Sequence, residues 1–185
     1  MQAHLDTESH LRKLASEDPS FTYTIIRIGL YSESFPIYTA FFNLKSPVDE
    51  ILIPHDGEGK GVAWAKRDEL GEGVARIMKN YVESPGTFQY VKERVLLSGP
   101  KEYSLKETVE ILGEMIGKEV KIRQVSIEAY AAQEQVRRVL GDGAPVWASA
   151  WEGIRRGETA VVTSVLEDTL GRKPESFERT IADMI

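Results

Sequence analysis

Hydrophobic positions along this chain recur with two periods, one typical of strands and one typical of helices. Apolar or β-branched runs, and alternation of apolar with charged residues, predict strands. Apolar residues spaced three or four apart predict amphipathic helices. The predicted strands cover residues 22–28, 50–53, 61–66, 95–98 and 120–125, and the predicted helices cover residues 1–16, 37–44, 68–80, 104–116, 126–140, 145–154, 162–170 and 177–184. This mixture predicts an α/β fold.

Residues 22–28 form a predicted strand that is rich in β-branched and aromatic residues. The run Thr-Tyr-Thr-Ile-Ile-Arg-Ile suits a strand covered on both faces, as in a parallel sheet packed between helices. Gly29 ends the strand, and the polar and aromatic loop 31–35 follows it. Because ligands of open α/β sheets bind beyond the carboxyl ends of the strands, a site is expected at this loop. An ordinary surface loop after a buried strand fits the same pattern.

Local signals elsewhere predict structure rather than chemistry. Ser104 and Glu107 have the spacing of a capping box, and Asp68 is expected to cap the helix that follows it. The glycine-rich run 57–61 lacks the Gly-Lys-Ser/Thr ending of a phosphate loop and is expected to be a turn. No His-Glu-x-x-His motif occurs, and His4 and His10 are not four residues apart, so no metal site is expected.

Composition narrows the possible functions. The chain has 185 residues, of which 42% are hydrophobic, which is enough for one domain with a core. Its net charge of −6 and its scattered Lys and Arg argue against a nucleic-acid-binding face. Without cysteine it has neither a disulfide framework nor a thiol nucleophile. The N-terminus has no apolar leader, and no run approaches the ~18 apolar residues of a membrane span, so a cytoplasmic protein without membrane contact is expected.

Four motifs, in the same order along the chain, resemble those of one family. Residues 4–8 match a His-x-x-Thr-Glu helix motif, and residues 23–34 resemble the strand and loop that follow it. Residues 64–70, Trp-Ala-Lys-Arg-Asp-Glu-Leu, resemble a strand-to-helix junction, and residues 170–174 resemble a Leu-Gly-Arg-x-Pro turn. Together they resemble the NmrA-like, atypical short-chain dehydrogenases. That group includes NAD(P)H:quinone reductases and NmrA-type redox-sensing regulators.

The resemblance implies the C-terminal portion of an NAD(P)-binding Rossmann-type fold, with parallel strands and a small helical substrate-binding subdomain. The family begins with a glycine-rich turn that holds the dinucleotide pyrophosphate, but no Gly-x-x-Gly-x-x-Gly or Gly-x-Gly-x-x-Gly occurs here. The N-terminal βαβ units are therefore expected to be absent, with Met1 at a position that is internal in the family. We expect one NmrA-like domain over residues 1–185, with 1–35 and about 88–100 in the sheet and about 36–87 and 101–185 in the substrate-binding part.

Two residues are candidates for catalysis. The resemblance places His4 where related reductases carry the lysine of Tyr-x-x-x-Lys, and imidazole can relay a proton near neutral pH. A histidine so close to the chain terminus can equally have no role. Tyr31 lies two residues beyond Gly29, where it is expected to pack on a nicotinamide or to hydrogen-bond a quinone carbonyl. A loop aromatic that closes the core is the alternative.

Further contacts are expected around this loop. The cofactor is expected to contact Ile28, Gly29, Leu30 and Tyr31. Three aromatic residues are expected to wall an apolar substrate pocket, unless they are simply part of the core: Phe35, Tyr38 and Trp64.

Two functions of different class remain open. The resemblance implies an NAD(P)H-dependent oxidoreductase acting on a quinone or other aromatic carbonyl, with secondary metabolism as one setting. The alternative is a non-catalytic NmrA-like redox-sensing or regulatory protein that binds a partner. Quinone-reducing relatives often have Asn at the position of Ile28 and Trp at that of Leu30, so the substrate stays open. NADP or NAD is implied as cofactor, but without the glycine turn this chain alone is expected to bind it weakly and to self-associate through an exposed sheet edge.

Overall fold

A computed structural model gives the conformation of residues 2–185, and the expectation about Met1 lies outside the described residues. Helices and strands follow one another in this order: α1 (Gln2–Glu17), β1 (Ile25–Ile28), η1 (Ser32–Ser34), α2 (Phe35–Tyr38), β2 (Glu50–Ile53), α3 (Arg67–Glu83), η2 (Pro85–Thr87), β3 (Arg94–Leu97), α4 (Leu105–Met115), β4 (Lys121–Gln124), α5 (Ile127–Ala132), α6 (Glu134–Leu140), η3 (Gly141–Gly143), α7 (Ala144–Trp147), α8 (Ser149–Arg155), α9 (Val165–Leu170) and α10 (Phe177–Ala182). No helix among residues 2–185 has both the length and the apolar character needed to cross a membrane.

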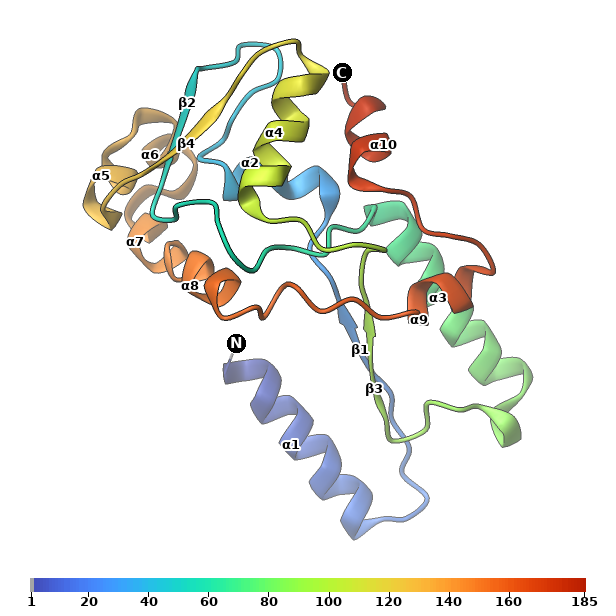
Figure 1. Ribbon diagram of the computed structural model, residues 1–185. Helices are drawn as coiled ribbons and strands as arrows, with labels where there is room; N and C mark the ends of the chain where they lie inside the picture. Colours follow the sequence, from blue (N-terminus) through green and yellow to red (C-terminus); the bar gives the residue numbers. More distant parts are fainter. Residues whose placement is uncertain (1) are drawn as a thin grey trace.

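The described strands form two small parallel sheets (Figure 1). Strand β1 pairs with β3, from Ile25 opposite Arg94 to Ile28 opposite Leu97. Strand β2 pairs with β4, from Glu50 opposite Lys121 to Ile53 opposite Gln124. The prediction that residues 22–28 and 95–98 lie in one parallel sheet is confirmed, although β1 begins only at Ile25. The α/β fold class is confirmed as well.

Each sheet lies beside its own hydrophobic cluster. Helix α1 covers one side of the β1–β3 sheet, and α3 and α9 cover the other, so this part has three layers (Figure 1). Between the sheet and the latter two helices lies a core of Leu70, Ile77, Val95, Leu97, Leu166 and Leu170. The larger core joins β2 to α2, α4, α5–α8 and α10. Helix α3 thus packs on the β1–β3 sheet, while the predicted division of the chain into sheet and substrate-binding parts stays a prediction.

Several helix ends match the local signals in the sequence. Ser104 accepts a hydrogen bond from the Glu107 N–H, and the Glu107 side chain returns one to the Ser104 N–H, so the capping box is confirmed. Ser126 caps α5 through the Ala129 N–H. Gly171 ends α9 in the left-handed conformation, with φ 67°. These bonds join residues within a few positions of one another, which is why the sequence alone reveals them.

Other expectations were wrong where distant segments intervene. Residues 61–66 form no strand but an extended segment with two isolated bridges, Tyr31 to Ala65 and Val62 to Tyr103. Asp68 does not cap α3, because the helix begins at Arg67 and the carboxylate of Glu33 accepts from the Arg67 N–H instead.

Several predicted helices are shorter than expected, and the backbone explains two of them. The helix expected at 37–44 is only Phe35–Tyr38, because Ala40 and Phe41 take positive φ values of 48° and 60°. The helix expected at 126–140 breaks at Gln133, whose backbone is extended and whose side chain donates to the Leu52 carbonyl.

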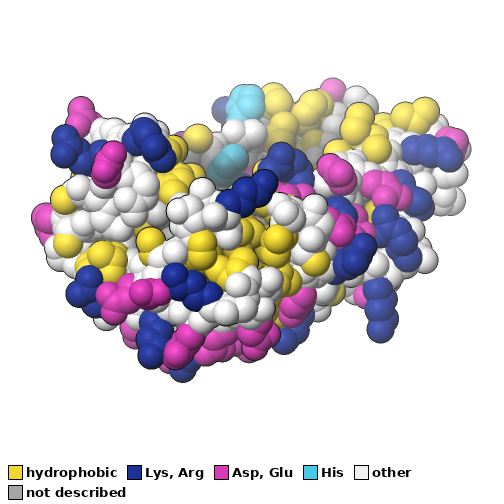
Figure 2. Space-filling view, turned by 90° about the horizontal axis from the view of Figure 1, so that it is seen from above, with side chains coloured by type: hydrophobic (Ala, Val, Ile, Leu, Met, Phe, Trp, Pro, Cys, Tyr) yellow, Lys and Arg dark blue, Asp and Glu magenta, His cyan; other side chains and the backbone are white. Residues whose placement is uncertain are grey.

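Charges on the surface are mixed in sign. Figure 2 shows Lys and Arg side chains interspersed with Asp and Glu around a band of hydrophobic side chains. On the face in this view, the basic side chains do not form the continuous positive stripe that binds a nucleic-acid backbone.

Candidate active site

Helix α1 is fastened to the β1–β3 sheet by one buried carboxylate, that of Glu8. Its side chain is only 3% exposed. It accepts hydrogen bonds from Arg27 Nε and Nη2 at 3.0 and 2.6 Å, and from Arg94 Nη1 at 3.3 Å. Arg12, one turn along the helix, adds a bond of 2.9 Å. The hydrogen bond from Arg27 lowers the pKa of Glu8, so this carboxylate stays ionised and ties α1 to both strands.

This attachment determines where His4 lies. His4 and Glu8 are four residues apart, so they share the face of α1 that looks toward the sheet. Helix α1 and β1 run in opposite directions (Figure 1). Four residues of an α-helix rise about 6 Å, which corresponds to about two residues along a strand beyond Arg27. His4 therefore lies near the level of Gly29, where β1 ends, and its side chain is exposed.

An extended segment, residues 62–65, crosses the carboxyl ends of both strands, and we call it the strap. The Ala65 N–H donates to the Leu30 carbonyl at 3.0 Å, and the Ser32 N–H donates to the Ala65 carbonyl at 2.9 Å. At the end of β3, the Gly99 N–H donates to the Ala63 carbonyl at 3.2 Å. The strap thus fixes the loop after β1 to the loop after β3.

Glycine makes this crossing possible. A Cβ atom on Gly99 would overlap the Trp64 carbonyl oxygen, and one on Gly61 would overlap the Tyr103 carbonyl oxygen. At Gly29 a Cβ would lie 3.1 Å from the Leu97 carbonyl oxygen. These positions need glycine because backbone passes directly over backbone. The space beside Gly29 and Gly99 is filled by protein, so neither forms an open turn for a phosphate.

The predicted cofactor residues lie together at the end of β1, with different exposure. Ile28 is 47% exposed and Tyr31 is 36% exposed, whereas Gly29 and Leu30 are half-buried. Leu30 packs against the larger core. The exposed side chains at this end of β1 are therefore Ile28 and Tyr31.

The three aromatic residues expected to wall a substrate pocket lie in the core. Phe35, Tyr38 and Trp64 are at most 7% exposed. Trp64 stacks on Phe177 with ring centroids 5.5 Å apart, and its Nε1–H donates to Thr108 at 3.0 Å. Burial raises the pKa of Tyr38 to about 12. Of the two roles open to these rings, their burial favours the core.

The sequence did not single out two residues beside Tyr31. The guanidinium carbon of Arg67 lies 5.5 Å from the centre of the Tyr31 ring. The hydroxyl of Ser32 is fully buried and has no hydrogen-bond partner among the described residues. Arg67 lies inside the motif 64–70, and Ser32 lies inside the motif 23–34. Their motifs were therefore visible, but their individual roles depend on the pairing of the two segments.

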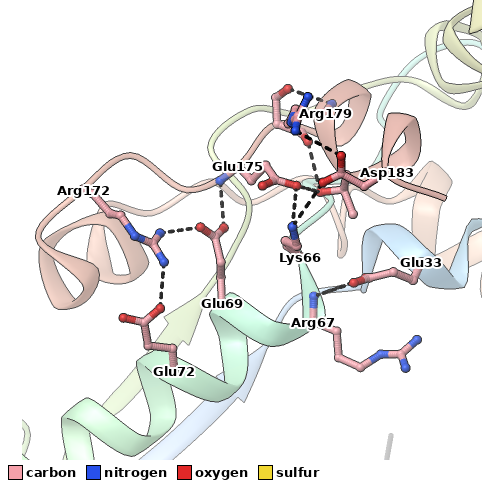
Figure 3. A network of polar contacts seen from close by, with 11 residues as sticks. Glu33, Lys66, Arg67, Glu69, Glu72, Arg172, Glu175, Arg179 and Asp183 are labelled. Atoms are coloured by element: carbon pink, nitrogen blue, oxygen red, sulfur yellow. Dashed lines mark hydrogen bonds and ion pairs between the residues drawn. The ribbon is translucent and has the colours of Figure 1, made fainter.

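A network of ion pairs lies at the start of α3 and fastens the C-terminal segment there (Figure 3). Lys66 Nζ lies 2.8 Å from Glu175, and Arg172 pairs with Glu69 and Glu72. Burial acts to raise the pKa of Glu175, but the hydrogen bonds from Lys66 and Thr180 and the charges of Lys66 and Arg179 together outweigh it and lower that pKa. The network satisfies its own charges, so we assign it a structural role. Among residues 2–185, no cluster of three or more His, Asp or Glu side chains could hold a metal ion.

Comparison with known proteins shows which sequences this chain resembles. No family model matches the chain. It is 30% identical over 176 residues to the NmrA-like family domain-containing oxidoreductase flvB of Aspergillus flavus, covering 94% of this chain and 52% of that protein. It is 21% identical to Prestalk A differentiation protein A of Dictyostelium discoideum over 158 residues, covering 85% of this chain and 49% of that protein. The chain spans about half the length of both relatives.

Solved structures share the fold. A nucleoside-diphosphate-sugar epimerase of Staphylococcus aureus is 25% identical, with a TM-score of 0.69 over 92% of this chain and 55% of that one. The NADPH-dependent quinone oxidoreductase QOR2 of Escherichia coli is 20% identical, with a TM-score of 0.73, and the match covers 99% of this chain and 60% of that one. The triphenylmethane reductase of Citrobacter sp., complexed with NADP(H), is 19% identical, with a TM-score of 0.70, and the match covers 94% of this chain and 56% of that one. This chain is therefore a homologue of the NmrA-like oxidoreductases, and its mixed α/β structure matches the C-terminal part of the NAD(P)-binding reductase fold.

Proposed function

We propose that this chain carries the substrate side and the nicotinamide-end contacts of an NAD(P)H-dependent reductase of quinones or other aromatic carbonyls, acting in the cytoplasm. The observation that supports the proposal is the attachment of α1 to β1 through Glu8 and Arg27, because His4 lies four residues from Glu8 on the same helix. In this proposal His4 and Tyr31, two groups that can donate a proton or a hydrogen bond, would both serve a ligand bound beyond the end of β1.

The residues fit one end of the cofactor better than the other. Exposed Ile28 offers apolar surface to a flat nicotinamide ring, and the exposed Tyr31 ring is left for the acceptor. A pyrophosphate needs open backbone N–H groups, and the glycines at the strand ends are closed by the strap. NADP or NAD is therefore proposed as cofactor through its nicotinamide end, and we expect these 185 residues by themselves to bind NADPH weakly.

Each residue has a defined task in the proposed reaction. When bound, the reduced nicotinamide supplies a hydride to the carbonyl carbon of the substrate. The Tyr31 ring would hold the acceptor ring, and its hydroxyl would orient the carbonyl oxygen. His4 would deliver the proton that this oxygen takes up. Glu8 acts at a distance, because its ion pairs keep the face of α1 that carries His4 turned toward the sheet.

The test compares Tyr31→Ala with Ile26→Ala in the reduction of menadione by NADPH. Tyr31→Ala is expected to lower kcat/KM at least tenfold, which is about 1.4 kcal/mol, with little effect on unfolding because the ring is exposed. Ile26 packs against the sheet core, so Ile26→Ala should cost about 2 kcal/mol of stability and leave the kinetics of the folded fraction unchanged. Because NADPH is expected to bind weakly, the assay uses saturating NADPH, and an unmodified chain that gives no turnover above background under that condition would contradict the reductase and favour a non-catalytic, regulatory protein.

A further inference from the structure

Tyr31 and Arg67 are held side by side by the backbone of two segments. Tyr31 bridges to Ala65 in parallel register, and the flanking Leu30 and Ser32 each exchange a hydrogen bond with Ala65. The Arg67 N–H donates to both carboxylate oxygens of Glu33 at 3.2 Å. The contact between the Tyr31 ring and the Arg67 guanidinium thus follows from a fixed scaffold.

The Arg67 guanidinium is available to a ligand. Figure 3 shows its side chain leaving the start of α3 in a direction away from the network around Lys66. Within residues 2–185 the guanidinium of Arg67 forms neither an ion pair nor a hydrogen bond, and its contact is with the Tyr31 ring. By contrast, neighbouring Lys66 lies within 4 Å of two carboxylates, those of Glu175 and Asp183. A free guanidinium with five donors is well suited to a planar anion.

Asp68 directly follows Arg67, and the acidic residue nearest to Tyr31 along the chain is Glu33. Both of its carboxylate oxygens accept from the Arg67 N–H at the start of α3. The positive end of the helix dipole partly balances its charge there. The carboxylate is thus engaged by the backbone, and the guanidinium of Arg67 stays free for a ligand.

We propose that Arg67 and Tyr31 together select an aromatic substrate that carries an anionic group, such as a carboxylate or a sulfonate. The proposal rests on the proposed function, because it assigns the substrate class of the same site. The Tyr31 ring would contact the substrate ring, and Arg67 would pair with its anion. A ring and a cation at this spacing fit an aryl anion better than an isolated phosphate, so we assign the anion to the substrate and not to the cofactor.

Binding measured by calorimetry separates these contacts. The probes are anthraquinone sulfonate, its neutral hydroxymethyl analogue, and nicotinamide mononucleotide. The unmodified chain is expected to prefer the sulfonate. Arg67→Gln should weaken sulfonate binding about tenfold and change the neutral quinone less than twofold. Arg67→Lys keeps the charge but loses the planar donors, so its affinity for the sulfonate should lie between those of the unmodified chain and of Arg67→Gln. The matched control is Arg138→Gln, which removes an exposed arginine of α6 that forms no ion pair with the described residues and should change neither affinity.

The outcomes distinguish this inference from the proposed function. If Arg67→Gln weakens both quinones equally, or neither, the role of Arg67 is overturned while quinone binding stands. If Arg67→Gln weakens the binding of nicotinamide mononucleotide and not that of the sulfonate, the anion recognised by Arg67 belongs to the cofactor, and the substrate assignment is overturned. If the unmodified chain binds neither quinone, the proposed function fails together with this inference.

Discussion

Gly99→Ala tests whether the strap passes directly over the end of β3. The added Cβ would overlap the Trp64 carbonyl oxygen, well inside the 3.0 Å that real Cβ contacts respect, so the strap must move. Trp64 is fully buried, and a shift would disturb its hydrogen bond to Thr108 and its stacking on Phe177. Overpacking costs about 1–3 kcal/mol and a lost hydrogen bond about 1 kcal/mol. We expect the free energy of unfolding to fall by about 3 kcal/mol, which corresponds to a fall in Tm of about 6–12 °C for a chain of this size.

Gly71→Ala is the matched control, because it adds the same atom in an open place. Gly71 is exposed in α3, and a Cβ there would meet nothing within 4 Å. Alanine favours the helix, so the free energy of unfolding of this variant should rise by about 0.5–1 kcal/mol. Urea unfolding followed by tryptophan fluorescence measures both variants under the same conditions. If Gly99→Ala unfolds within 0.5 kcal/mol of the unmodified chain, the close crossing of the strap is wrong.

Two further predictions concern pH and association. His55 is fully buried, and its Nδ1 accepts from the Gly57 N–H. Burial and the charge of Arg155 lower the pKa of His55, against the opposite effects of Asp56 and Glu152. Because the unfolded chain then takes up this proton first, stability should be full above pH ~6.5 and fall as the pH drops below it. Urea titrations at several pH values should show this slope, and His55→Gln should flatten it. Separately, the free edge of β1 beside exposed Ile28 should make these 185 residues self-associate in sedimentation experiments, and a monomer with a sharp cooperative melt would count against it.

The sequence alone determined the features that depend on neighbours along the chain. The capping box of Ser104 and Glu107 and the left-handed Gly171 form from bonds within one turn, so their residue types and spacing are sufficient. The apolar runs around Ile25 and Val95 predicted strands because both are covered by helices, and the motifs carried the family resemblance. The rule that sites lie beyond the carboxyl ends of parallel strands singled out Tyr31, and its role stays a prediction.

Only the tertiary structure decided the contacts between distant segments. Glu8 joins Arg27, 19 residues away, and Arg94, 86 residues away, and no local pattern encodes that choice of partner. The pattern of residues 61–66 looks like a strand, but its partners change from Tyr103 to Tyr31 along the segment, so no ladder continues.

The same reason explains what the sequence left open at the site. Phe35, Tyr38 and Trp64 have the composition of either a pocket wall or a core, and burial by α10 and α4 favours the core. Asp68 has the residue type of a helix cap, but Glu33 reached the start of α3 from 34 residues away. Residue type states which bonds a side chain can make, and the fold determines which partner lies within reach.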